Sequence, residues 1–192
     1  KGRKGTIDEG GLRSPFFIRW PRKIQPGKTI PEIAGAIDLL PTLLDLTGIP
    51  ARINKRKPLD GRSLGPLLLA DPGNWMPRTL FSIKRNQVSV RTQQYRLDAT
   101  GKLYDIESDP GQRTDVAAHH AELAAKLGML AKQHNAQMQV HFKANASRPF
   151  TVGYGASTTL TARDGVGHGT IQRSAKAPNN SFFTNWTTAD DF

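Results

Sequence analysis

The chain has 192 residues, of which 37% are hydrophobic and none is cysteine, and its formal net charge at pH 7 is +11. The absence of cysteine excludes disulfide bonds, thiolate metal sites and a cysteine nucleophile within these residues. No apolar run reaches the roughly 18 residues that a membrane span needs, and the hydrophobic fraction supports a core over only part of the length.

The basic residues are scattered along the chain, and their densest run, residues 52–57, lies between two prolines. We interpret this run as a solvated loop, with attraction to an anionic substrate as the second interpretation. The competing hypothesis from another class is a basic module that binds nucleic acid or an anionic glycan. Basic and aromatic residues do not interleave on any one predicted element, so we expect no nucleic-acid partner.

The chain begins at Lys1, without a methionine or a first secondary-structure element. We interpret it as a fragment of a longer protein, so the lack of a visible signal peptide says nothing about location. The apolar run at residues 16–20 is typical of a buried strand, which Pro21 ends. The alternation at residues 33–37 predicts a short extended piece.

A short buried helix is predicted between Asp38 and Gly48. The Asp38 carboxylate is expected to cap the helix by accepting from amides of the first turn, which makes this residue a cap and not a catalytic acid. Gly48 is the expected C-terminal stop. The face predicted to be buried holds Leu40, Leu43, Leu44 and Thr47.

After a loop at residues 50–63, a second apolar turn is expected at residues 64–69. Four short strand patterns follow at residues 80–83, 88–92, 95–97 and 102–106, and their polar turns predict an antiparallel meander. A helix is predicted from Val116 to Gln137. Its apolar stripe, which should cover one face of the sheet, consists of Val116, Leu123, Leu127 and Leu130.

The last part of the chain changes composition. Residues 144–181 are rich in Ser, Thr, Gly, Ala and Asn, which predicts a linker or loosely packed loops. Residues 181–192 turn aromatic again, and we interpret them as the truncated start of a further domain of β-sandwich, carbohydrate-binding type.

The most informative stretch is residues 4–15 (KGTIDEGGLRSP), which we call the lysine loop. By itself it permits a bland interpretation, a glycine turn beside solvated charges. Together with the apolar run behind it, however, it resembles the sulfatase family, the sulfuric ester hydrolases related to alkaline phosphatases. Further blocks of the same family pattern follow in order at residues 38–44 (DLLPTLL), 60–69 (DGRSLGPLLL), 90–92 (VRT), 103–105 (LYD) and 109–111 (DPG).

The resemblance implies an α/β fold class. Residues 1–76 would be the end of an alkaline-phosphatase-like α/β core. Residues 77–143 would be the C-terminal α+β subdomain, a four-stranded antiparallel sheet packed by one long helix. Residues 144–192 would be the linker and the truncated further domain.

The resemblance also implies a chemistry. Sulfatases use a formylglycine, made from Cys or Ser in a Cys/Ser-x-Pro/Ala-x-Arg motif, beside a calcium ion held by Asp and Asn oxygens. This chain has no such motif, and the metal ligands are expected upstream of it. We therefore expect the chain to be inactive alone. A phosphohydrolase of the same superfamily is the alternative, because the fold does not determine which ester is cleaved.

Lys4 is the one catalytic residue that the resemblance transfers, as the lysine that binds the substrate sulfate and stabilises negative charge in the transition state. Lys1 is its nearest rival. Glu9 and Arg13 are expected to be structural, pairing with each other or bonding loop amides. Asp8 stands where relatives often have an aromatic residue.

No histidine is transferred. The doublet His119 and His120 lacks the spacing of a metal site, and His134 is expected to be packed or half-exposed. The implied substrate is a sulfated small molecule or a sulfated glycan, and the family resemblance implies a periplasmic or secreted protein.

Overall fold

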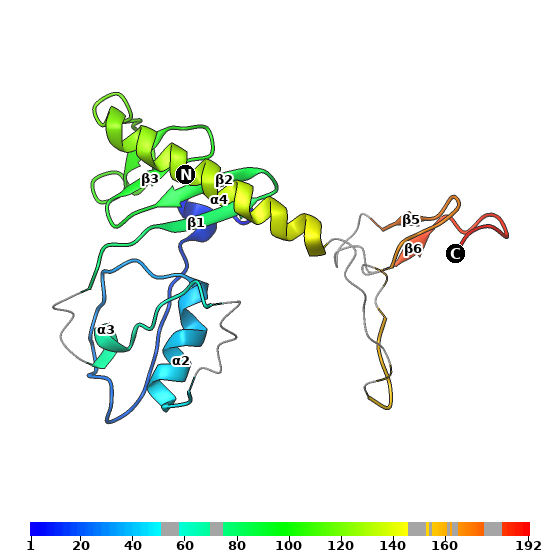
Figure 1. Ribbon diagram of the computed structural model, residues 1–192, viewed down its shortest axis with the longest axis horizontal. Coiled ribbons are helices and arrows are strands. Elements are labelled where there is room, and N and C mark those ends of the chain that lie inside the picture. Colours follow the sequence, from blue (N-terminus) through cyan, green and yellow to red (C-terminus); the bar gives the residue numbers. More distant parts are fainter. Residues whose placement is uncertain are drawn as a thin grey trace. The chain divides into compact units, whose positions relative to one another are not determined.

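The structure is a computed structural model that describes residues 1–50, 58–69, 75–145, 153, 155–160, 162, 165–174 and 182–192 (Figure 1). It divides into two compact units, Lys1–Ala144 and Asn145–Phe192. The basic run at residues 52–57 lies outside the described residues. Among the helices that are described, none combines the length and the apolar character needed to cross a membrane.

The first unit contains the predicted meander. Its strands are β1 (Leu80–Lys84), β2 (Gln87–Arg91), β3 (Tyr95–Leu97) and β4 (Leu103–Asp105). They pair antiparallel in the order β1-β2-β3-β4. The register places Val90 opposite both Phe81 and Leu97, and Leu97 opposite Leu103. One row of apolar side chains therefore crosses the whole sheet.

The long helix α4 (Ala121–Asn145) lies across this sheet (Figure 1). Leu127 is 2% exposed and joins Val90, Leu97 and Leu103 in the core. Leu123 and Leu130 of the predicted stripe pack against the same core, which confirms the stripe for its members on α4. Val116 packs there too, but it lies before the helix. The helix begins at Ala121 and ends at Asn145, so both ends lie further along the chain than the predicted Val116 and Gln137. In the turn before it, the Asp115 carboxylate accepts from the N–H groups of Leu103 and Ala117. We call β1–β4 with α4 the sheet–helix layer.

The prediction of a buried strand at residues 16–20 is wrong. These residues belong to no strand, Phe17 is 90% exposed and Phe16 is 56% exposed. Ile18 packs against a small separate core of Leu64, Leu67 and Leu68, the last two from α3 (Gly65–Leu69). An apolar run forms a strand only where another strand satisfies its backbone groups, and none of the described strands does so here.

The predicted helix is present as α2 (Leu39–Thr47), and Gly48 ends it with a left-handed φ of 65°. It follows the 3₁₀ turn η1 (Ala36–Asp38). The extended piece predicted at residues 33–37 is wrong for Ala36 and Ile37, which lie in this turn, and residues 33–35 form no strand. Two details differ from the prediction. Leu40 and Leu43 are 53% and 56% exposed, so the leucine face is not buried, while Thr42 is buried.

The second detail is the role of Asp38, which is fully buried but does not cap α2. Its carboxylate accepts from the N–H groups of Gly35 at 2.8 Å and Arg62 at 2.9 Å, and it pairs with Arg78 at 2.8 Å. These partners come from three separate segments, so Asp38 links them and is structural, as expected.

The second unit contains a two-stranded pairing of β5 (Gln172–Arg173) with β6 (Phe183–Thr184). Near β6, the Asp191 carboxylate accepts from the N–H groups of Thr188, Thr170 and Thr187, which lowers the pKa of this carboxyl group well below its usual range. The short helix α1 (Glu9–Leu12) lies in the first unit. The assignment of these residues to a further domain, and the division of the first unit at residue 76, stay predictions.

Candidate functional site: the lysine loop and its supports

Lys4 lies in a tight turn that the loop forms with its own backbone. The Thr6 N–H donates to the Arg3 carbonyl at 2.9 Å, and Gly5 has a left-handed φ of 86°. A β-carbon at Gly10 would collide with the Gly2 carbonyl oxygen. Glycine is therefore needed there for close approach of backbone to backbone.

Glu9, in α1, is the buried anchor of the loop at 6% exposure. Its Oε1 atom accepts from Arg91 Nε at 3.0 Å and pairs with Arg96 Nη2 at 2.7 Å. Arg91 and Arg96 stand directly opposite each other on β2 and β3. Two like charges in this position repel, so the carboxylate of Glu9 compensates both. Burial lowers the pKa of Arg91, and the Glu9 charge opposes that shift.

Arg96 and Ser89 hold the loop at a second point, the Ile7 carbonyl. Arg96 Nη1 donates to this oxygen at 3.1 Å, and Ser89 Oγ donates to it at 2.6 Å. Arg96 Nη1 also donates to Ser89 Oγ at 2.9 Å. Both side chains are buried, at 5% and 0% exposure, so these hydrogen bonds are sheltered from water.

Gln112 supports the same loop from the turn that follows β4. It is 4% exposed and has a positive φ of 53°, which is costly for a residue with a side chain. Its Oε1 accepts from the Glu9 N–H at 2.8 Å, and its Nε2 donates to Asp8 at 3.4 Å. The backbone of Gln112 is thus strained at the residue whose side chain bonds the lysine loop.

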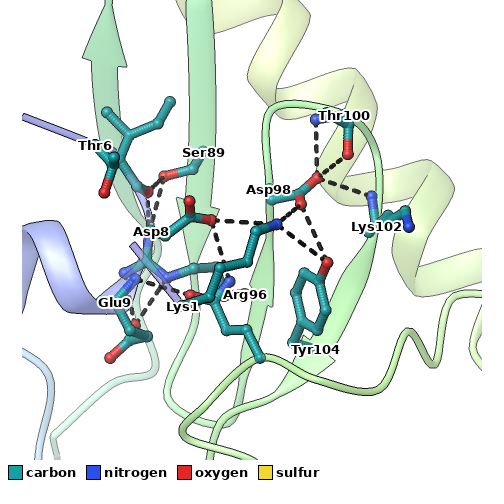
Figure 2. Close-up of polar contacts among 12 residues, drawn as sticks. Lys1, Thr6, Asp8, Glu9, Ser89, Arg96, Asp98, Thr100, Lys102 and Tyr104 are labelled. Carbon is teal, nitrogen blue, oxygen red and sulfur yellow. Dashed lines mark hydrogen bonds and ion pairs between the residues drawn. The ribbon is translucent and has the colours of Figure 1, made fainter. Parts of the chain in front are cut away.

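Lys1, just before the loop, is bound to the sheet (Figure 2). Its ammonium donates to Asp98 Oδ2 at 2.7 Å and to the Tyr104 hydroxyl at 3.2 Å, and it lies 3.6 Å from Asp8. Burial alone would raise the pKa of Asp98, but hydrogen bonds from Lys1, Thr100 and the Lys102 backbone outweigh it and lower that pKa to about 2. The hydrogen bond to Asp98 raises the pKa of Lys1.

Lys4 is exposed, as Lys1 is, but the two lysines differ in their partners. Within the part of the chain that the structure describes, its ammonium has no hydrogen bond or ion pair. The neighbouring residue is held nevertheless, because Lys84 at the end of β1 donates from Nζ to the Gly5 carbonyl. The backbone next to Lys4 is therefore restrained, while its ammonium has no partner among the described residues.

The predicted structural role of Glu9 is confirmed by these contacts, but its predicted pairing with Arg13 is wrong, since Arg13 is exposed and Glu9 pairs with Arg91 and Arg96. The sequence reasoning missed Arg96 and Gln112 altogether. A signal for Arg96 existed, namely a charged residue between apolar ones in a predicted inner strand, where burial requires a counter-charge.

The described residues contain no group of three or more His, Cys, Asp or Glu side chains that could hold a metal ion. His134 is half-buried and stacks on Phe81, with ring centroids 4.1 Å apart, as a packed histidine should. His120 lies against Tyr95 at 5.2 Å between centroids.

Comparison with known proteins identifies the family. Residues 3–139, more than half of the chain, match the family model described as N-sulphoglucosamine sulphohydrolase, C-terminal. Steryl-sulfatase of Mus musculus is 41% identical over 71 residues, which cover 37% of this chain and 11% of that protein. Arylsulfatase A of Homo sapiens is 35% identical over 162 residues, which cover 68% of this chain and 31% of that protein.

A solved structure has the same fold. The crystal structure of Ps i-CgsB superposes with a TM-score of 0.59 at 22% identity, over 78% of this chain and 37% of that one. The sheet–helix layer and the lysine loop bound to it thus correspond to the C-terminal part of a larger fold. The chain belongs to the sulfatase family. It spans about a third of the length of arylsulfatase A.

Proposed function

We propose that this chain is the C-terminal part of a sulfuric ester hydrolase of arylsulfatase type, in which Lys4 binds the sulfate group of the substrate. The observation that carries the proposal is the state of the lysine loop. The loop lies within the residues that match the family model. Its backbone accepts hydrogen bonds from Lys84 and Arg96 of the sheet–helix layer, and Lys4 is exposed.

The chemistry suits this residue. Hydrolysis of a sulfate ester breaks the bond between sulfur and the leaving oxygen, and negative charge shifts within the sulfuryl group and onto that oxygen. A fixed ammonium beside the group stabilises this charge, and removing such a contact typically lowers kcat about 10²–10³-fold. The exposed Lys4 ammonium on a restrained turn meets this requirement better than Lys1, whose ammonium is already bound to Asp98.

The nucleophile and the calcium ion are assigned to other parts of the full-length protein. The chain has no cysteine and no Ser-x-Pro-x-Arg or Ser-x-Ala-x-Arg sequence from which a formylglycine is made. The described residues offer no metal cluster either. We therefore expect no turnover by the chain alone.

The substrate class follows from the names of the relatives. Steryl-sulfatase and arylsulfatase A name small sulfated molecules, and the family description names a sulphated amino sugar. We infer a sulfated small molecule or a sulfated glycan as the substrate, and a periplasmic or secreted location for the full-length protein.

The test is the hydrolysis of an aryl sulfate and an aryl phosphate by the full-length protein, with calcium present. We expect turnover of the sulfate, no turnover by the 192-residue chain, and a loss of about 10²–10³ in kcat for Lys4→Ala. Lys102→Ala, which changes another exposed lysine, is the matched control and should keep full activity. Preference for the phosphate would favour the phosphohydrolase alternative, and an unaffected Lys4→Ala variant would remove the role assigned to Lys4.

A further inference from the structure

We propose that Arg96 is a positioning residue for Lys4: by binding the lysine loop at two points, it sets where the lysine ammonium stands relative to the substrate. The proposal rests on the sulfate-binding role of Lys4 proposed above. It assigns to the sheet–helix layer a function in catalysis beyond stabilising the fold.

The two points of attachment are the Glu9 carboxylate and the Ile7 carbonyl. Arg96 Nε and Nη2 lie 2.8 Å and 2.7 Å from Glu9 Oε1, and Nη1 lies 3.1 Å from the Ile7 oxygen. A planar guanidinium presents these donors in a rigid fork. The positions of Ile7 and Glu9 are therefore coupled to each other and to β3.

This coupling matters because the Lys4 side chain has no anchor of its own. The Lys4 ammonium has no partner among the described residues, so the position of this side chain is set by the loop backbone that carries it. Lys84 restrains the backbone at Gly5, and Arg96 restrains it at Ile7 and Glu9. A shift of about 1 Å in a group that contacts substrate costs about 10²-fold in rate.

Charge alone does not supply this restraint. Lysine at position 96 would keep the positive charge but has a single nitrogen on a flexible stem, so it bonds Glu9 or Ile7 and not both in a fixed geometry. Arg78 provides a matched control. It pairs with Asp38 at 2.8 Å, its side chain is 6% exposed, and its described contact lies outside the lysine loop. Arg96 is buried to a similar degree, at 5% exposure.

The experiment is a double-mutant cycle in the full-length protein, with kcat and KM for an aryl sulfate measured separately. We expect Arg96→Lys to lower kcat about 10–100-fold and Arg78→Lys to leave kcat within about twofold. In a Lys4→Ala background, Arg96→Lys should lower kcat by no more than about twofold, because its effect passes through the missing lysine.

An equal loss in both backgrounds would overturn the positioning role, as would an equal loss for Arg78→Lys. Failure of Lys4→Ala to lower kcat contradicts the proposed function instead, so the two failures are distinguishable. If Arg96→Lys does not fold, Ser89→Ala takes its place in the cycle, because Ser89 contacts both Arg96 and the Ile7 carbonyl.

Hydrogen exchange of the 192-residue chain gives a readout that does not need activity. Arg96→Lys should raise the exchange rate of the Thr6 and Gly11 amides about tenfold or more relative to Arg78→Lys, since both donate within the loop. Equal exchange rates in the two variants would show that Arg96 does not restrain the loop and would overturn the proposal.

Discussion

Two parts of the first unit bury their apolar side chains to very different extents. In the sheet–helix layer, Val90 and Leu103 are fully buried and Leu127 is 2% exposed. In the segment before it, Phe17 is 90% exposed and Leu43 is 56% exposed. In the layer, the apolar side chains of the sheet face those of α4. Residues 13–50 instead contribute partly buried side chains, among them Ile18 and Leu46, to the small core around Leu67. Apolar composition alone does not decide burial, because burial needs a second surface.

The lysine loop is a third case, since it is held on the sheet by polar contacts rather than by a core. Glu9 is buried between two arginines, and Gln112 and Ser89 bond its neighbouring backbone. Such contacts are directional, so they fix position as well as adding stability. The proposed role of Lys4 requires an ammonium at a defined place, and directional contacts of this kind would meet that requirement.

The largest expected effect is that of Glu9→Gln. This change leaves the guanidinium groups of Arg91 and Arg96 buried opposite each other without a counter-charge. We expect the free energy of unfolding to fall by about 3–5 kcal/mol, measured by urea denaturation. Glu107→Gln, on the exposed turn after β4, is the control and should change it by less than about 0.5 kcal/mol. Equal changes would mean that the loop is not anchored by this carboxylate.

The next effect compares the two apolar regions directly. Leu127→Ala removes a side chain that is 2% exposed in the core under α4, and we expect a loss of about 2–5 kcal/mol in the free energy of unfolding. Leu43→Ala makes the same chemical change at 56% exposure on α2. It should cost less than about 1 kcal/mol in the isolated chain. A cost equal to that of Leu127→Ala would contradict the contrast between the two regions.

A smaller effect depends on pH. The pKa of Asp98 is lowered to about 2 in the folded chain, from an ordinary value of 3.8. Its contribution to stability is therefore fully present above the ordinary value and is lost as the pH falls through about 2. The stability difference between the wild type and Asp98→Asn should shrink by about 1–2 kcal/mol between pH 5 and pH 2.

Urea denaturation at several pH values in that range measures this difference. Asp60→Asn, which changes an exposed carboxylate, is the control and should show a pH profile parallel to that of the wild type. A difference between wild type and Asp98→Asn that stays constant down to pH 2 would show that the Lys1 contact does not hold Asp98 in its charged form.

The smallest effect is expected at Phe17. Because this side chain is 90% exposed, Phe17→Ser should change the free energy of unfolding of the isolated chain by less than about 0.5 kcal/mol. Thermal denaturation followed by circular dichroism is sufficient to measure it. A loss of about 2 kcal/mol or more in the free energy of unfolding, as expected for a buried aromatic side chain, would instead support the predicted burial of residues 16–20.

The sequence predicted the sheet–helix layer well because its signals are local. Alternation over a few residues marked each strand, and the spacing of Leu123, Leu127 and Leu130 marked the covering face of the helix. The same method was wrong about residues 16–20, whose apolar run carries no information on whether a strand lies beside it. The helix at α2 was found, but its buried side was not, for the same reason.

For the candidate site, the family resemblance indicated Lys4, and the glycine pair indicated a tight turn. The partners of Glu9 could not be derived in this way. Arg91 and Arg96 become a single site for one carboxylate only when the register of β2 and β3 sets them opposite each other, far along the chain from the loop. The sequence by itself therefore determined the elements of the sheet–helix layer and the family resemblance, from which Lys4 was proposed as the sulfate-binding residue. The tertiary structure decided what holds that lysine in place, since electrostatic and hydrogen-bond contacts act between atoms that are near in space, whatever their separation in sequence.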